Sequence, residues 1–515
     1  MKKILIIICI IFISCNSFAN TQNNRSNNEY NYDNMVDAIK NNDYTKVKSF
    51  IEKGIDINSK VSFSFLHIAC KEGRTEIAKL LIDSGINIDE PDINGITPLH
   101  WAVMNNKLDT AKLLIEMNAD VNKGDNYKRT PIHSATKDGF FLLVQLLIDN
   151  DANVCVIDEY KYTPLHVAAT YNRHLIAELL IKNGADIYAE NYNKETPFDE
   201  AIPYGIDVAK VLISKGYEIN YKKEYPEQLL KQAIHWKQPL FIKLLIENDA
   251  NSAYKNEDGQ SLLHLSAIFN SYELSDFLIK RGLDLNEKDN LGNTPLIYAS
   301  MYSDSNVTKL LIDKGTKLNV KNETGMYPIH IASQNAKIEN IKLLLDLKID
   351  VNSLDNNGLM PIQYVTNGDY KTLNFLIENG GNIKIKNKQG QSLIHLIIMN
   401  YNLILALKQK NYDNPHYDNP HKEVKACLDL RYDLPDVNNY LKTIELLLNS
   451  GFDINSVDNK GNSALFYASN IEVAKLLLKY NIDANIKNID GKTALDLLKN
   501  DDVKKAITEY LKDTK

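Results

Sequence analysis

Apolar residues along the chain recur as two short helix-like stretches separated by a polar turn, and the pattern returns every 33 residues. The first stretch opens with Thr followed by Pro, most clearly at Thr97, Thr130 and Thr163. A Thr at the N-cap and a Pro in the first turn favour the start of a helix. The second stretch carries paired aliphatic residues and ends at Gly or Asn, which suits a left-handed helix cap. Each repeat therefore predicts a pair of helices.

The opening motif has many weaker copies in the same register. Copies begin at Ser64, Thr97, Thr130, Thr163, Thr196, Ser261, Thr294, Tyr327, Met360, Ser392, Ser463 and Thr493. Self-similarity at a fixed period of this length is typical of a solenoid, in which one helix pair cannot bury its apolar face alone and neighbours must stack.

Thr-Pro-Leu-His-x-Ala in a 33-residue unit is the signature of the ankyrin repeat, and the sequence closely resembles that family. The resemblance covers about 13–14 units between residues 31 and 515. It implies an all-α repeat solenoid in which each unit is a helix-turn-helix with a projecting β-hairpin. We expect hairpins at segments such as 92–96 and 289–293.

Four segments depart from the repeat. Residues 35–54 lack the Thr-Pro opening and are expected to form a polar N-terminal cap, and residues 503–515 a C-terminal cap. The unit at 221–252 also lacks Thr-Pro, which predicts a slightly distorted joint. Residues 400–440 hold an insertion between the two helices of one unit, and such insertions map to loops.

The first 19 residues predict a signal peptide. A basic start precedes the apolar run 4–13, which is too short to span a bilayer. Cleavage before Asn20 would give a free periplasmic or secreted protein of a bacterial type, whereas a lipidated Cys15 would give an envelope-anchored lipoprotein. Residues 20–30 are Asn-rich and predict a flexible lead-in. No later segment is long and apolar enough to predict a transmembrane helix.

The overall composition favours a folded protein that does not bind nucleic acid. The 515 residues carry a formal net charge of −7 with no long basic stretch. Cys70, Cys155 and Cys427 remain after the leader, too few and too widely spaced for a disulfide framework. We expect Cys70 and Cys155 to be small buried residues, because both fall at repeating positions. The chain is expected to be a monomer.

Seven of the eleven histidines lie in the repeat motif, namely His67, His100, His133, His166, His264, His330 and His395. The family resemblance implies that this imidazole is a structural hydrogen-bonding bracket near the hairpin base. The remaining histidines are His174, His235, His416 and His421. They neighbour no nucleophile motif, and no phosphate loop, dinucleotide fingerprint or paired CxxC is present. The sequence therefore predicts no enzyme and no cofactor.

A tandem Tyr-Asp-Asn-Pro-His inside the insertion offers a possible metal site at Asp413, His416, Asp418 and His421. The residue types are suitable ligands, but the spacing matches no known closed site. A turn-rich duplicated loop is the favoured interpretation. A loop that contacts a partner is the intermediate alternative.

The hairpins carry the candidate binding residues. Most units have Gly two residues before the motif Thr, where a turn needs positive φ, but three consecutive units have Lys128, Lys161 and Lys194. A non-Gly residue there typically costs ~1 kcal/mol. The same hairpins carry Tyr127, Arg129, Tyr160, Tyr162 and Tyr192. Stacked tips would form a Tyr/Lys/Arg strip, and Tyr and Arg are frequent hot-spot residues. The alternative is that these tips only contact water.

These observations favour an exported interaction scaffold that binds a partner protein through its hairpin tips and concave helix face. A secreted, host-directed effector or toxin-like protein is the second hypothesis, although no domain outside the repeats supports it. An enzyme with its site inside residues 400–440 is the third.

Overall fold

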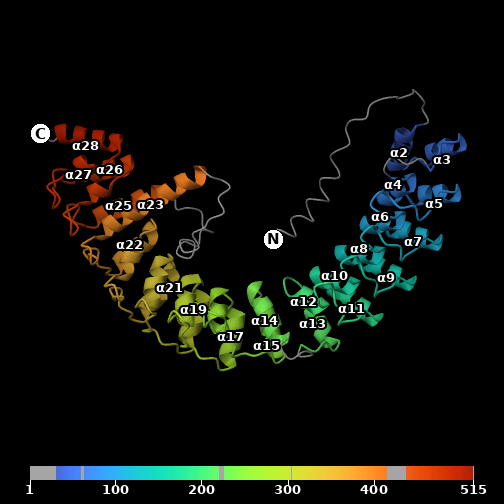
Figure 1. Cartoon of the computed structure of the whole chain (residues 1–515), viewed down its shortest axis with the longest axis horizontal. Helices are drawn as coiled ribbons and strands as arrows, with labels where there is room; N and C mark the ends of the chain where they lie inside the picture. The colour runs from blue at the N-terminus through green and yellow to red at the C-terminus, as the bar shows by residue number, and fades with distance from the viewer. Residues whose placement is uncertain (1–30, 59–62, 220–224, 303, 414–436, 514–515) are drawn as a thin grey trace. The chain divides into compact units, whose positions relative to one another are not determined.

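The computed structural model describes residues 31–58, 63–219, 225–302, 304–413 and 437–513. The chain divides into two compact units, Met1–Gln232 and Ala233–Lys515. Both are stacks of helix pairs, which Figure 1 labels in chain order. The described residues contain fourteen such pairs.

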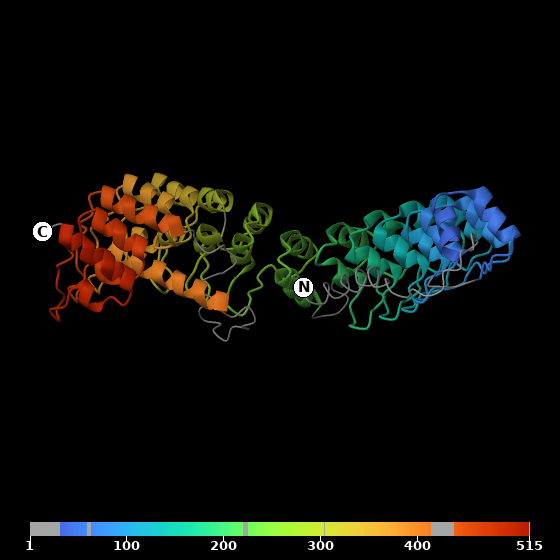
Figure 2. The same cartoon turned by 90° about the horizontal axis from the view of Figure 1, so that it is seen from above.

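In the first unit, the two helices of each pair are antiparallel neighbours joined by a tight turn (Figure 2). The pairs are α2 (Tyr32–Lys40) with α3 (Tyr44–Glu52), α4 (Phe65–Glu72) with α5 (Thr75–Asp83), α6 (Pro98–Met104) with α7 (Leu108–Glu116), α8 (Pro131–Asp138) with α9 (Phe141–Asp149), α10 (Pro164–Thr170) with α11 (His174–Lys182), and α12 (Pro197–Ala201) with α13 (Ile206–Ser214).

The second unit continues the alternation, and α14 (Tyr225–His235) crosses the division between the units. After α14 come α15 (Pro239–Glu247), α16 (Leu262–Ile268), α17 (Tyr272–Lys280), α18 (Pro295–Tyr302), α19 (Ser305–Asp313), α20 (Pro328–Gln334), α21 (Ile338–Asp346), η1 (Pro361–Tyr364), α22 (Tyr370–Glu378), α23 (Leu393–Asp413), α25 (Val437–Asn449), η2 (Ala464–Tyr467), α26 (Ile471–Lys479), α27 (Ala494–Leu497) and α28 (Asp501–Asp513). The predicted cap segments 35–54 and 503–515 fall on α2–α3 and α28.

Local chemistry starts and ends these helices as the sequence predicts. The Thr97 side chain accepts the backbone N–H of His100, which satisfies one of the unpaired donors at the start of α6. Pro98 occupies the first helical turn, where its missing N–H costs nothing. Just beyond the second helices, Asn118 and Gly184 have φ of 67° and 93°, the left-handed conformation that closes a helix C-terminus.

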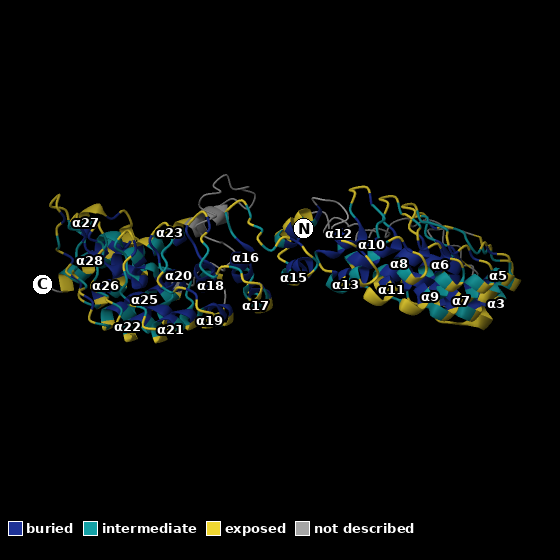
Figure 3. Ribbon diagram, turned by 90° about the horizontal axis from the view of Figure 1, so that it is seen from below, coloured by how far each residue is buried: buried dark blue, intermediate teal, exposed yellow. Residues whose placement is uncertain are grey.

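The core lies between stacked pairs, where first helices pack on first helices and second helices on second helices. Its smallest members are alanines that let the first helices approach closely, and its largest common members are leucines of the second helices. The alanines recur at Ala69, Ala102, Ala135 and Ala168, and the leucines recur at Leu81, Leu114, Leu147 and Leu180. The buried residues form a band inside each unit, with exposed residues on the loops and on the outer helix surfaces (Figure 3).

The predicted hairpins are present as compact five-residue turns, not as strands. At 92–96 the Asp92 N–H donates to the Ile96 carbonyl at 2.9 Å, and at 289–293 the Asp289 N–H donates to the Asn293 carbonyl at 3.0 Å. The described residues contain three isolated β-bridges, Lys255 with Ser261, Lys386 with Ser392 and Val457 with Ser463.

The joint predicted at 221–252 begins with a different inter-repeat contact. Asp199 stands where other units have the motif His, and its carboxylate accepts the Thr196 N–H at 2.8 Å. The Tyr225 hydroxyl at the start of α14 also donates to this carboxylate. Burial raises the pKa of the Asp199 carboxyl. Residues 220–224 lie outside the described residues.

The insertion predicted at 400–440 begins inside a helix. The first helix of that unit, α23, runs for 21 residues to Asp413, so the N-terminal part of the segment is not a loop. Its neighbours η1 and η2 are single turns, and their ends are capped by α23: Asn400 donates to the Thr366 carbonyl and Asn402 to the Tyr467 carbonyl, both at 2.7 Å. Residues 414–436, with His416, Asp418, His421 and Cys427, lie outside the described residues.

The two cysteines expected in the core have different surroundings. Cys70 is buried, but Cys155 is exposed, so the prediction for Cys155 is wrong. The Cys155 side chain makes the same inter-repeat hydrogen bond as Asn122, the equivalent residue of the preceding repeat. Asn122 donates to the Asp151 carbonyl at 3.0 Å, and the Cys155 thiol to the Gly184 carbonyl at 3.3 Å. The position therefore needs a surface donor and not a small apolar residue.

Residues 1–30, with the predicted signal peptide, Cys15 and Asn20, lie outside the described residues. Across the part of the chain that is described, no helix combines the length and the apolar character needed to cross a bilayer.

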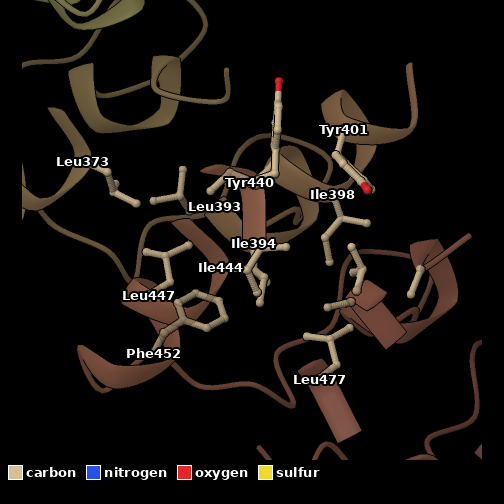
Figure 4. Close-up of a cluster of buried hydrophobic side chains, with 14 of the residues drawn as sticks. Leu373, Leu393, Ile394, Ile398, Tyr401, Tyr440, Ile444, Leu447, Phe452 and Leu477 are labelled. Atoms are coloured by element: carbon tan, nitrogen blue, oxygen red, sulfur yellow. The ribbon is translucent and has the colours of Figure 1, made fainter. Parts of the chain in front are cut away.

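The core of the second unit includes two fully buried tyrosines, Tyr401 on α23 and Tyr440 on α25 (Figure 4). The rings of Tyr401 and Tyr440 lie 5.2 Å apart. Tyr440 also packs over Gly368, where an added Cβ would come within 2.8 Å of the ring. Among the described residues, neither tyrosine hydroxyl has a hydrogen-bond partner. A buried polar group without a partner costs free energy.

We expect Tyr440→Phe to raise the free energy of unfolding by about 1 kcal/mol, because it removes an unpaired hydroxyl and keeps the ring. Tyr440→Ala, the matched control, should lower it by about 3–5 kcal/mol by leaving a cavity. Guanidinium denaturation of the full chain measures both changes. A loss of stability in the Phe variant would mean that the hydroxyl is bonded.

Candidate protein-binding surface

Each hairpin of the candidate strip is closed by its own backbone and by its first residue. In the 125–129 turn, the Asp125 N–H donates to the Arg129 carbonyl at 2.9 Å, and the Lys128 N–H returns to the Asp125 carbonyl at 2.8 Å. The Asp125 carboxylate accepts the N–H groups of Tyr127 and Arg129. A carboxylate or amide oxygen at the first position thus accepts backbone N–H groups of the same turn and stabilises it, as in Asx turns.

Backbone hydrogen bonds also join successive tips. The Glu159 N–H donates to the Tyr127 carbonyl at 2.8 Å, and the Tyr192 N–H donates to the Tyr160 carbonyl at 3.2 Å. These bonds fix the spacing between neighbouring hairpins. The three tips form one continuous edge of the first unit, on the exposed loops beside α8, α10 and α12 (Figure 3).

Three tyrosines of the strip stand in solvent. Tyr127, Tyr160 and Tyr192 are 44%, 55% and 63% exposed. The Arg129 guanidinium lies 4.9 Å from the Tyr127 ring centre, and the Lys161 ammonium lies 5.1 Å from that of Tyr192. Cation–π contacts of this kind stabilise the position of an exposed ring by about 0.5–1 kcal/mol.

The charges of the strip are mixed. Arg129 pairs with Asp125 at 2.8 Å, and Lys194 pairs with Glu190 at 3.2 Å. Lys128 is exposed, and its ammonium group makes no ion pair with any described residue. The strip is therefore a tyrosine-rich surface of nearly balanced charge, not a basic patch.

Tyr162 lies differently from the other members of the expected strip. Its side chain is half-buried, and its hydroxyl donates to the Glu200 carboxylate on α12. Burial and the adjacent Glu200 raise the pKa of the Tyr162 hydroxyl, and burial raises the pKa of the Glu200 carboxyl. The structure thus brings seven of the eight candidate residues to the surface and uses Tyr162 as a tie between repeats.

The first helices beside the tips add aromatic surface. The Trp101 indole donates to Asp92 at 3.2 Å, and the Lys71 ammonium lies 5.4 Å from the Trp101 ring. Tyr171, which directly follows α10, is exposed, and the Lys137 ammonium lies 5.9 Å from its ring.

The three lysines have the backbone conformation that their position predicts. Lys128, Lys161 and Lys194 have φ of 60°, 62° and 65°. Gly95 and Gly325, at the equivalent position of other hairpins, have φ of 79° and 80°. The lysines therefore carry the steric cost of the left-handed region, about 1 kcal/mol each, which glycine avoids.

A second role of these glycines is not evident from one hairpin alone. A Cβ on Gly95 would lie 2.5 Å from the Asn126 backbone nitrogen, and one on Gly325 would lie 2.2 Å from the Asn356 side-chain oxygen. Each of these asparagines donates back to a carbonyl of the preceding tip. The lysine tips at 128 and 161 are followed by Glu159 and Tyr192 instead. The restriction is not specific to asparagine, because a Cβ on Gly292 would lie 2.9 Å from the Glu323 backbone nitrogen.

The motif histidines are buried hydrogen-bonding brackets, as the resemblance implies. The His133 ring lies 3.0 Å from the Thr130 hydroxyl and 3.1 Å from the Tyr162 carbonyl of the next repeat. The other six make the equivalent inter-repeat contact at 2.9–3.2 Å. His174 and His235 are exposed. Within the described ranges, no group of three His, Cys, Asp or Glu side chains is arranged to hold a metal ion.

A stack of helix pairs with projecting turns defines a helical repeat protein. A family model described as Ankyrin repeats (3 copies) matches residues 35–125, 118–191, 229–322, 315–387 and 436–505. These matches cover well over half of the chain, so the protein belongs to the ankyrin repeat family. Ankyrin repeats are generally protein–protein interaction modules and typically non-enzymatic. The chain has no match among curated proteins.

We expect Lys128→Gly to raise the free energy of unfolding of the first unit by about 0.5–1 kcal/mol, because it removes the left-handed strain. Gly95→Ala should lower it by more than about 1 kcal/mol, because the new methyl group meets Asn126. Denaturant titration of the full chain compares the two. A destabilised Lys128→Gly variant would show that the lysine side chain holds the tip together.

Proposed function

We propose that this protein is an exported scaffold that binds a partner protein through the tips at 125–129, 158–162 and 191–195. The adjoining faces of the first helices complete the proposed site. The export part of the proposal is supported by the sequence of residues 1–19.

The proposal is carried by the left-handed backbone strain of Lys128, Lys161 and Lys194. Three successive hairpins keep lysine in a conformation that favours glycine. Lys128 makes no ion pair among the described residues, Lys161 lies over the Tyr192 ring, and Lys194 pairs with the half-buried Glu190. Such costs are commonly retained where a side chain serves function.

The exposed tyrosines support the same surface. Tyrosine provides a large, rigid and amphipathic contact area with little loss of conformational entropy, which is why it is frequent in binding sites. The bonds between tips mean that Tyr127, Tyr160 and Tyr192 are presented at fixed spacing, so little ordering is needed when a partner binds.

The decisive experiment is site-specific photo-cross-linking in the producing cells. A photoreactive phenylalanine analogue at Tyr160 should yield one discrete cross-linked protein, whereas the same analogue at Leu291 should not. Leu291 is the matched control, because it is the third residue of its hairpin and is 63% exposed.

For the partner so identified, Tyr160→Ala should raise the Kd at least about tenfold, as expected for an interface hot spot. Charge reversal at Lys128, Lys161 and Lys194 should also weaken binding, and Leu291→Ala should leave the Kd unchanged. An unchanged affinity after triple charge reversal would rule out the strip as the site.

A further inference from the structure

Each tip of the candidate surface is held closed by a histidine of the preceding repeat. The His100 Nε2 lies 2.9 Å from the Arg129 carbonyl, the same oxygen that accepts the Asp125 N–H to close the 125–129 turn. His133 contacts the closing carbonyl of the 158–162 turn at 3.1 Å, and His166 that of the 191–195 turn at 3.1 Å.

The other ring nitrogen fixes the protonation state. The Thr130 backbone N–H donates to the His133 Nδ1 at 3.2 Å, so this nitrogen must be an unprotonated acceptor and Nε2 must carry the ring proton. Thr97 and Thr163 donate in the same way to His100 and His166. A second proton on Nδ1 would face a backbone N–H. A protonated ring could still donate from Nε2 to the hairpin carbonyl, but it would leave the buried Thr N–H without its acceptor and would place a charge in the core, so the closed arrangement favours the neutral ring.

The charged groups around the three rings do not reverse the preference for the neutral form of each imidazole. Asp92, Asp125 and Arg129 surround His100, and Asp125 with Arg129 surrounds His133. For His166 the neighbouring charges are Asp186 and Glu195. Burial outweighs the acidic neighbours. It lowers the pKa of His133 and His166 to about 4, and it lowers the pKa of His100.

We propose that mild acid opens these three hairpins and thereby releases the bound partner. The release of the partner rests on the proposed function, because the hairpins that open are the ones that carry the binding residues. The opening of the hairpins by acid concerns the protein alone.

The direction of the pH effect follows from linkage. An opened bracket exposes a histidine with an ordinary pKa near 6.5, so the open state takes up more protons than the closed state below that value. The closed hairpin is therefore most favoured above pH 6.5 and loses that preference as the pH falls towards 4. For His133, opening should become about 30-fold more frequent between pH 7.5 and pH 5.

The chain provides its own controls. The hairpin at 322–326 follows Ile297, which has no ring to donate, and the hairpin at 387–391 follows Gln363. The Gln363 side-chain oxygen accepts the Met360 N–H at 3.0 Å, but its nitrogen has no hydrogen-bond partner among the described residues. Glutamine therefore keeps the helix cap and loses the inter-repeat bond, and neither control hairpin has a titrating bracket.

Hydrogen–deuterium exchange of the full chain, followed by mass spectrometry from pH 7.5 to pH 5, tests the opening. After correction for intrinsic exchange, protection at 158–162 and 191–195 should fall about 30-fold relative to 322–326 and 387–391, and protection at 125–129 should also fall. Equal losses at bracketed and unbracketed hairpins, or no loss at either, would overturn the proposal.

The variant His133→Gln isolates one bracket. It should lower protection at 158–162 already at pH 7.5 and abolish its pH dependence, whereas 191–195, held by His166, should stay acid-sensitive. An unchanged pH profile at 158–162 would overturn the proposal. Because the wild-type comparison needs no variant, a His133→Gln chain that fails to fold leaves the first measurement decisive.

Cross-linking from the Tyr160 position at pH 7.5 and pH 5 tests release. Loss of the cross-link at pH 5 supports it, and a persistent cross-link alongside opened hairpins overturns it. Absence of a cross-link at both pH values refutes the proposed function and the release with it, whereas exchange alone still decides whether acid opens the hairpins.

Discussion

In seven of the repeats, one buried imidazole links the helix cap, the next hairpin and the shared core. In the case of His133, Nδ1 completes the cap of its own helix, and Nε2 reaches the carbonyl that closes the next hairpin. The same side chain is buried between the first helices, where the stacked pairs share their core. A repeat therefore does not determine its own surface. The order of each displayed hairpin depends on the repeat before it, as expected for a one-dimensional stack.

Natural replacements of this histidine separate its two roles. Gln363 keeps the cap but does not reach the next hairpin. Asp199 also keeps the cap, but a carboxylate can only accept, so the next repeat must supply a donor, which is the Tyr225 hydroxyl. The direction of the inter-repeat hydrogen bond is therefore reversed where the regular repeat is interrupted: the following repeat donates and the preceding repeat accepts.

Features encoded at a fixed spacing could be predicted from the sequence. The helix starts, the hairpin positions and the left-handed lysines follow from residues within a single repeat, because caps and turns are local. Features that depend on the adjacent repeat could not. The Tyr162 hydroxyl lies inward, where it donates to Glu200 of the following repeat, and α23 caps the ends of both neighbouring single turns through Asn400 and Asn402.

The distribution of glycine and lysine along the hairpins follows from the same dependence on neighbours. A Cβ at some tips would lie too close to the following hairpin, at 2.5 Å from the Asn126 backbone nitrogen for Gly95 and 2.9 Å from the Glu323 backbone nitrogen for Gly292, so glycine fits there. Lys128 and Lys161 precede Glu159 and Tyr192, and these tips carry a side chain at the cost of left-handed backbone strain. The three lysine hairpins are consecutive, so their side chains form a continuous row. A continuous row of tolerated side chains is what an extended binding edge needs, and a single permissive tip would not provide it.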